Sequence, residues 1–166
     1  MIVAGDFNSV PGSAAHSLLI SGAVDPGHPE LHNDPMGILR PSSRLQHQLP
    51  LASAYAALSA GGGGGPVVQQ QRRRMDAQHH EPRLTNVGRD FQVGGSRMGG
   101  VLLAATLLLT HQGTLDYVLY TTDSLQPVAL LELPDEGELR KSTGLPSEAW
   151  SSDHVALMAE FAVVGK

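Results

Sequence analysis

The chain has 166 residues, 41% of them hydrophobic, which is the size and apolar content of one globular domain or of a piece of a larger one. Its net charge of −5 argues against broad, unspecific adhesion to nucleic acid, although an enzyme that grips one phosphate through bound cations stays possible. The absence of cysteine excludes a disulfide framework and a cysteine-ligated zinc site. The longest apolar run, residues 101–109, is too short to cross a bilayer, so we expect no membrane association.

The first twelve positions predict a strand followed by a turn. Apolar residues 2–4 lead into Gly5, and Asp6 and Asn8 follow with a spacing of two. At the end of a strand that spacing places both side chains on one side, at the kind of sheet edge where α/β proteins often hold their chemistry. A buried strand and a turn without any function would give the same string, and both interpretations stay open at this point.

Residues 13–21 predict a short helix, with Ser13 as its N-cap and Gly22 at its end. Repeated X-Pro pairs then predict a long loop over residues 23–50. His28 and His32 in this loop could be metal ligands, but no regular element fixes their spacing, and a surface loop is the favoured interpretation.

Residues 51–58 fit a helix or a strand equally well. The glycine tract at 61–65 indicates a flexible linker or a loop tip. The charged run QQQRRR at 69–74 could clamp phosphate, but a solvated face is favoured. Residues 92–112 carry almost no charge, and their leucine run favours a buried helix near 101–110.

The last third of the chain predicts strands. Residues 113–120 are a strand candidate that contains Asp116, a carboxylate that should have a partner because burying it alone is costly. Residues 124–133 predict a second strand, with Pro127 at an edge or a bulge, and residues 135–141 a short helix or turn. Asp153 and His154 open a further predicted strand over 152–161.

Three polar clusters therefore stand at predicted strand ends: Asp6 with Asn8, Asp116, and Asp153 with His154. Phosphodiester hydrolysis uses these residue types, because carboxylates hold a divalent cation and orient water while an amide or imidazole meets the phosphoryl oxygens. A carboxylate fixes the tautomer of a histidine and favours its charged form, so Asp116 and His154 are natural partners. A purely structural role for all three clusters is the least favoured alternative.

The motifs GDFN at 5–8, LDY at 115–117 and SDH at 152–154 stand in the order typical of the endonuclease/exonuclease/phosphatase superfamily, which the chain resembles. Longer stretches, among them GDFNSVPGSAAHSLL, HQLPLASAY, EPRLTNVGRDF and LPSEAWSSDHVAL, are similar to plant and algal carbon catabolite repressor-type deadenylases of the CCR–NOT complex. The resemblance implies an α/β fold in which residues 1–166 form the C-terminal half of a two-sheet sandwich.

The resemblance also implies roles for single residues. Asp6 would orient or deprotonate the attacking water, and Asn8 would bind the scissile phosphate near the adenine. Asp116 would hold His154, which would contact the phosphate and stabilise the transition state. Asp153 would assist the metal site.

The implied reaction is Mg²⁺-dependent 3′-exoribonuclease cleavage of poly(A), with 5′-AMP as the product. Phe91 would stack on the substrate adenine, as aromatic side chains do in many RNA sites. The resemblance further implies poly(A) RNA and CCR–NOT subunits as partners, and a location in the cytoplasm, the nucleus or both.

Two departures from the family pattern give further expectations. The resemblance places the principal metal-binding glutamate in an N-terminal half that precedes the GDFN strand, so we expect the chain to be a fragment that is poorly folded and weak in metal binding when alone. Relatives also have far fewer residues between the RDF and LDY motifs. Removing residues 93–112 would restore the family spacing. Val codons begin with GT and one Gln codon ends with AG, which are the boundaries of a spliceosomal intron. We therefore expect a retained intron or a loop insertion there.

Two other functions stay open. A phosphatase acting on a nucleotide would use the same framework. An inactive half-domain that binds protein or RNA would explain the missing glutamate.

Overall fold

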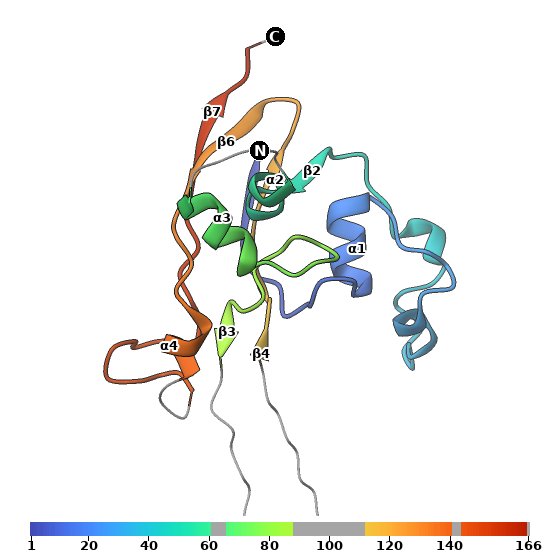
Figure 1. Ribbon diagram of the computed structural model, residues 1–166. Coiled ribbons are helices and arrows are strands. Elements are labelled where there is room, and N and C mark those ends of the chain that lie inside the picture. The colour runs from blue at the N-terminus through green and yellow to red at the C-terminus, as the bar shows by residue number, and fades with distance from the viewer. Residues whose placement is uncertain (61–65, 88–111, 141–143, 166) are drawn as a thin grey trace, which may run out of the picture.

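The structure, a computed structural model, describes residues 1–60, 66–87, 112–140 and 144–165 (Figure 1). The glycine tract at 61–65, Phe91 and all of the 93–112 stretch except Gln112 lie outside the described residues. The expectations for these segments therefore stay predictions.

The central sheet has three antiparallel strands in the order β1 (Ile2–Asp6), β5 (Asp116–Thr121), β2 (Leu51–Ser53). The strand predicted from residues 2–4 is thus confirmed, and the one predicted over 113–120 is confirmed from Asp116 onward, whereas Gly113 belongs to the separate strand β4. Asp6, the last residue of β1, lies opposite Asp116, the first residue of β5. Because the strands are antiparallel, the end of one and the start of the other meet at one end of the sheet, and two motifs far apart in sequence are brought together.

Helix α1 (Ala14–Ser21) begins and ends as its sequence predicts. The side chain of Ser13 accepts the backbone N–H of His16 at 3.2 Å, which satisfies one of the free donors at the start of the helix. Gly22 ends the helix in the left-handed conformation, with φ of 74°. The predicted loop 23–50 contains two short 3₁₀ helices, η1 (Pro29–His32) and η2 (Ser42–Arg44).

Residues 51–60 contain both of the structures that their sequence allowed. Strand β2 covers Leu51–Ser53, and α2 (Ala54–Ala60) follows it directly. Helix α3 (Pro66–Arg73) carries the glutamines and two arginines of the charged run and has no buried residue, as predicted for a solvated face. Arg74 behaves differently, because its guanidinium donates to the carbonyl of Leu133.

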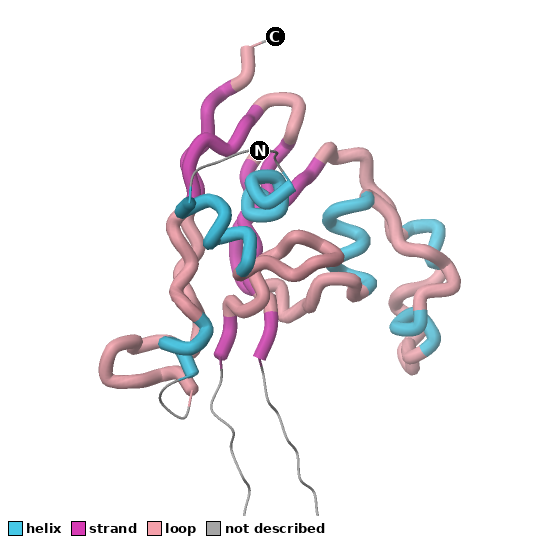
Figure 2. The backbone as a smooth tube through the Cα atoms, in the orientation of Figure 1, coloured by secondary structure: helices cyan, strands magenta, loops and turns pink. Residues whose placement is uncertain are grey.

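The other strands in the described part of the chain form two small antiparallel sheets, β3 (Asn86–Val87) with β4 (Gln112–Gly113) and β6 (Leu125–Leu130) with β7 (Ala159–Val163). The register of β6 shifts between Pro127 and Ala129, which confirms the predicted bulge. Helix α4 (Glu136–Arg140) occupies the segment predicted as a short helix or turn. Figure 2 shows β3 and β4 at the opposite end of the molecule from the β6–β7 sheet.

The predicted strand 152–161 is wrong for residues 152–158, because β7 begins only at Ala159. Asp153 and His154 instead lie in a bend next to β3, where His154 forms an isolated bridge with Asn86. The backbone N–H of Val87 donates to the carbonyl of Asp153 at 3.0 Å. Asp153 and His154 therefore pair briefly with β3, which is only two residues long, and do not begin the strand that was predicted for them.

Among the described residues the core includes two small clusters, one of which packs Val87, Leu139, Leu145 and Val155 together beside β3. The other contains Tyr55, Met75 and Leu133, with Leu130 and Leu157 packed against it.

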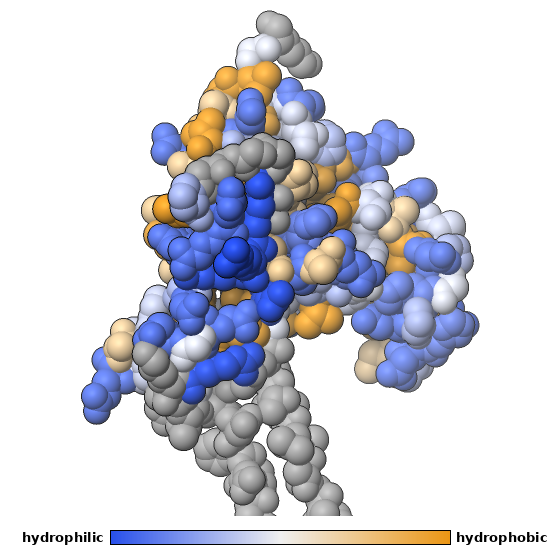
Figure 3. All heavy atoms as spheres, viewed as in Figure 1, coloured by the Kyte–Doolittle hydropathy of each residue, from blue (hydrophilic) through white to orange (hydrophobic). Residues whose placement is uncertain are grey.

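Large apolar side chains stay exposed on the outer strands. Ile2 is 52% and Val163 81% exposed, and Figure 3 shows hydrophobic residues gathered at the β6–β7 end. Uncovered apolar strands favour association with other surfaces. No helix in the described part of the chain combines the length and the hydropathy that a membrane span requires.

Candidate catalytic site

Asp6 and Asn8 lie together as predicted, but the geometry that joins them differs from the prediction. The chain leaves β1 after Asp6, and Asn8 adopts the left-handed conformation with φ of 48°, which Asn tolerates better than most residues. The backbone N–H of Asn8 donates to Asp6 Oδ1 at 2.8 Å, and its Nδ2 donates to Oδ2 at 3.2 Å. A tight turn closed by the Asp6 carboxylate, rather than strand alternation, brings the two groups together.

His154 lies between two carboxylates. Its Nδ1 is 2.8 Å from Asp116 Oδ2, so Nδ1 carries the proton and donates it, because an ionised carboxylate only accepts. Its Nε2 lies 3.9 Å from Asp6 Oδ2. The predicted contact between Asp116 and His154 is therefore present, and the sheet register adds Asp6 on the opposite side of the imidazole.

The surroundings of His154 favour its cationic form. Burial alone would lower the pKa of His154, but the hydrogen bond and charge of Asp116, with the charges of Asp153 and Asp6, outweigh burial and raise this pKa above its ordinary value. Like charges directly opposite each other on a sheet repel, so a cation beside the facing Asp6 and Asp116 also offsets a local cost of the fold. The site thus favours a proton on the outer nitrogen of a ring that Asp116 orients.

Tyr117 fixes the Asp6 turn to strand β5. Its hydroxyl donates to the carbonyl of Ser9 at 2.7 Å, and its ring packs edge-to-face with the ring of Phe7, with centroids 5.9 Å apart. Burial, followed by the charges of Glu81, Asp116 and Asp76, raises the pKa of Tyr117 far above its ordinary value. The phenol therefore stays a neutral donor at any working pH.

Two site residues were missed by reasoning from the sequence: Thr85 and Asn86. The Thr85 hydroxyl accepts the backbone N–H of Leu115 at 2.9 Å and that of Asp116 at 3.0 Å. Asn86 is buried, its Nδ2 lies 3.5 Å from Asp153 Oδ2, and its Oδ1 has no hydrogen-bond partner among the described residues. Neither residue carries a charge or a repeated spacing that would have marked it in the sequence.

The described carboxylates do not by themselves form a metal cage. Across residues 1–60, 66–87, 112–140 and 144–165, no group of three or more His, Asp or Glu side chains is placed to hold a metal ion. Both oxygens of Asp6 accept hydrogen bonds from Asn8, and Asp153 is exposed. Mg²⁺ prefers six oxygen ligands, commonly one or two carboxylates with water and substrate phosphate. Asp153 as a metal residue stays a prediction.

Comparison with known proteins identifies the family. The sequence profile described as the endonuclease/exonuclease/phosphatase family matches residues 1–154. The chain belongs to this family. Membership confirms the resemblance inferred from the GDFN, LDY and SDH motifs, and with it the α/β fold class. The family is one of hydrolases, and its name covers both nucleases and phosphatases.

Relatives within the endonuclease/exonuclease/phosphatase family are much longer than this chain. Carbon catabolite repressor protein 4 homolog 1 of Arabidopsis thaliana is 53% identical over 97% of this chain, which spans 23% of that relative. The CCR4-Not complex 3′-5′-exoribonuclease subunit Ccr4 of Aspergillus fumigatus is 31% identical over the whole chain and 18% of its own length. The crystal structure of ANGEL2, a 2′,3′-cyclic phosphatase, in complex with adenosine-2′,3′-vanadate matches 96% of this chain and 44% of its own, with TM-score 0.54 and 25% identity.

Proposed function

We propose that this chain supplies the Asp–His–Asp part of the catalytic site of a 3′-exoribonuclease that shortens poly(A). The observation that carries the proposal is the placement of His154, held by Asp116 on one nitrogen and facing Asp6 with the other. Support comes from the relatives, one of which is named as a 3′-5′-exoribonuclease subunit.

The proposed chemistry is the attack of water on a phosphodiester. Asp6 accepts a proton from the water while the water oxygen forms the new bond to phosphorus. The bond from phosphorus to the 3′ oxygen of the preceding nucleotide then breaks. That 3′ oxygen takes up a proton, and 5′-AMP is released. The chain's carboxylates orient the water at one face of the phosphate.

His154 and Asn8 handle the charge that develops on the phosphoryl group. The cationic ring donates from Nε2 to a phosphoryl oxygen, and Asp116 keeps the ring in the orientation that allows it. Asn8 Nδ2 already donates one hydrogen to Asp6, and it contributes its second N–H to the same phosphate. Phe91, which lies outside the described residues, remains the proposed stacking partner for adenine.

The proposal includes Mg²⁺ as the divalent metal ion of the site. Such an ion would neutralise charge on the phosphate. Asp153 is the residue of this chain proposed to assist it, together with ligands outside the described residues. Poly(A) RNA and CCR–NOT subunits are the proposed partners, with a location in the cytoplasm, the nucleus or both.

Two other functions have support of their own. The structural match to ANGEL2, a 2′,3′-cyclic phosphatase, favours a phosphatase acting on a nucleotide end. The incomplete set of metal ligands among the described residues favours a binding module without catalysis.

One experiment separates the three functions. The complete natural protein that contains this sequence is incubated with Mg²⁺ and 5′-labelled oligo(A), ending either in a 3′ hydroxyl or in a 2′,3′-cyclic phosphate. A ladder of shortened products and released 5′-AMP supports the exoribonuclease. Opening of the cyclic end without shortening supports the phosphatase, and retention of unchanged RNA on a filter supports the binding module.

A further inference from the structure

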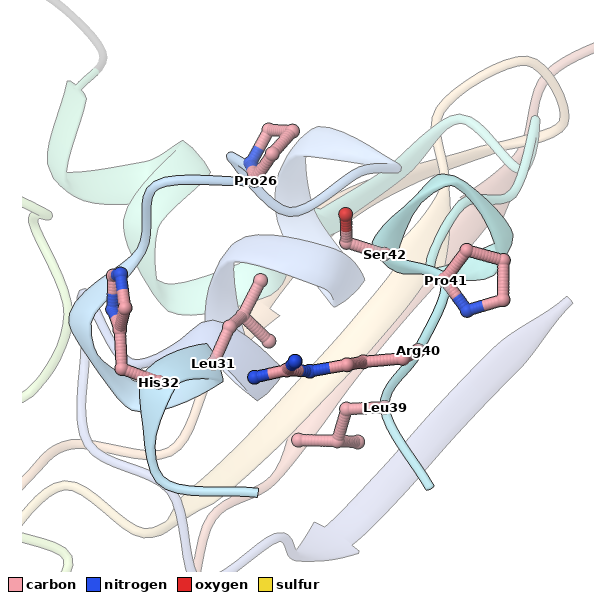
Figure 4. Close-up of a pocket in the computed structure, with 7 residues that line it drawn as sticks. All are labelled: Pro26, Leu31, His32, Leu39, Arg40, Pro41 and Ser42. Atoms are coloured by element: carbon pink, nitrogen blue, oxygen red, sulfur yellow. The ribbon is translucent and has the colours of Figure 1, made fainter. Parts of the chain in front are cut away.

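The segment 23–50 encloses a pocket that takes no part in the proposed chemistry. It has a volume of about 600 Å³ and lies beside η1 and η2 (Figure 4). Most of its wall is apolar or proline, with one guanidinium, one imidazole and one hydroxyl. The lining residues are Pro26, Leu31, His32, Leu39, Arg40, Pro41 and Ser42.

Arg40 is the charged group of this pocket. Its side chain extends across the opening between Leu31 and Leu39, toward His32 (Figure 4). Within the part of the chain that the structure describes, the Arg40 guanidinium has neither an ion pair nor a hydrogen bond. An exposed cation above an apolar floor is therefore available to a ligand that brings its own negative charge.

The acidic side chains of the same segment are used elsewhere. Asp25 Oδ1 accepts the backbone N–H of Gly27 at 2.7 Å, and Glu30 Oε2 accepts that of Ala14 at 2.8 Å. Asp34 accepts two backbone N–H groups, from residues 38 and 39, at 3.0 and 2.9 Å. These carboxylates accept backbone N–H groups that stabilise the turns of the loop. They therefore do not pair with Arg40, and its charge stays available to a partner.

The turn before Leu39 adds apolar contact area. Met36 is 82% and Ile38 73% exposed, which is high for side chains of this size. Leu31, by contrast, is only 8% exposed and forms the buried floor of the pocket. The surface thus combines a preformed apolar pocket, an adjoining pair of protruding apolar side chains and one uncompensated cation, which is the pattern of a peptide-binding surface.

We propose that this pocket docks an acidic segment of a partner protein. A carboxylate of that segment pairs with Arg40, and a neighbouring leucine or aromatic side chain enters between Leu31 and Leu39. Protein is favoured over RNA because residues 23–50 carry only two arginines. A repeated phosphate backbone needs several cations in a row, whereas a peptide carboxylate needs only Arg40, and the apolar pocket supplies the rest of the contact. The proposal goes beyond the catalytic function and is independent of it.

The test begins with selection of random 12-residue peptides, displayed on phage, on the complete natural protein. Counter-selection uses the Arg40→Glu variant, and Arg73→Glu, on the exposed face of α3, is the matched control. The expected result is enrichment of peptides in which Asp or Glu stands within two positions of Leu, Phe or Trp.

The enriched peptide is then synthesised and its Kd measured by calorimetry. We expect at least about tenfold weaker binding to Arg40→Glu and to no other arginine variant, with a similar loss when the peptide's acidic residues become amides. No enrichment, or equal binding to the wild type and Arg40→Glu, overturns the proposal. Arg40-dependent binding of oligo(A) that the peptide does not displace would also overturn it, in favour of an RNA site.

Discussion

Replacing Asp116 by Asn removes one charge from the site and leaves its shape almost unchanged. The 2.8 Å hydrogen bond to His154 Nδ1 loses its charge assistance, and the amide can turn its NH₂ toward the ring, which favours the wrong tautomer. Hydrogen bonds to charged groups contribute about 1.5–3 kcal/mol, and the exposure of 18% for Asp116 and 30% for His154 places this bond near the lower end. With the loss of orientation added, we expect kcat to fall roughly 100-fold.

The assay for Asp116→Asn is the shortening of labelled oligo(A) by the complete natural protein. We expect kcat to fall with KM little changed, because Asp116 acts through His154 rather than on the substrate. The pKa of His154, followed by NMR, should move down, because the Asp116 hydrogen bond and charge raise it in the wild type. Asp123→Asn, the same change at an exposed aspartate, is the control and should leave both quantities unchanged. Wild-type kcat in Asp116→Asn, or an unmoved His154 titration, would refute the reasoning.

Three further predictions concern stability, each measured by urea unfolding of the same protein. Tyr117→Phe removes the hydrogen bond to the Ser9 carbonyl and should cost about 1 kcal/mol, and an unchanged midpoint would show that the hydroxyl does not hold the turn. Gly22→Ala places a Cβ 2.7 Å from a backbone carbonyl oxygen at φ of 74°, so it should lower the free energy of unfolding by about 1–3 kcal/mol. The control is Gly37→Ala, where φ is 64° and no atom lies within 4 Å of the added Cβ, so its loss should be clearly smaller. Equal losses in the two variants would contradict this reasoning. The pKa of His154 is raised in the folded state, so its contribution to the free energy of unfolding should be complete below the unfolded pKa of about 6.5. That contribution should disappear as pH rises through the folded pKa, and His154→Gln should abolish this pH dependence.

The sequence correctly predicted those elements that depend only on residues close together along the chain. Helix α1 begins at the Ser13 cap and ends at Gly22, and each signal depends only on a residue and its near neighbours along the chain. The bulge at Pro127 is of the same kind, because proline cannot donate to a strand ladder. The short run 51–58 was ambiguous for a physical reason, since it contains a strand and a helix in direct succession.

Contacts between distant segments were outside what the sequence pattern could show. Reasoning from burial paired Asp116 with His154, but only the register of β1 and β5 places Asp6 on the other side of the ring. The bend at Asp153 depends on pairing with β3, a strand of only two residues, so the alternation after it was wrongly extended back to 152. Asn86 was missed because it has neither a charge nor a repeated spacing to mark it.

The left-handed conformation of Asn8 was also not evident from the pattern. A spacing of two predicts a shared side only while the chain stays extended, and here the chain has already turned. The prediction that Asp6 and Asn8 lie together was correct because the Asp6 carboxylate itself closes the turn.

The most direct test of the central claim compares the complete natural protein with its Asp6→Ala variant. The release of 5′-AMP from oligo(A) is measured in Mg²⁺ under single-turnover conditions, with folding checked by circular dichroism. The Asp6 side chain is 34% exposed at the end of β1, so its truncation should leave the central sheet intact, although it removes the two hydrogen bonds that close the turn to Asn8. The account predicts 5′-AMP release by the wild type and a loss of at least about 1,000-fold in the variant. Equal release by the two proteins would show that Asp6 and His154 do not form a phosphodiesterase site.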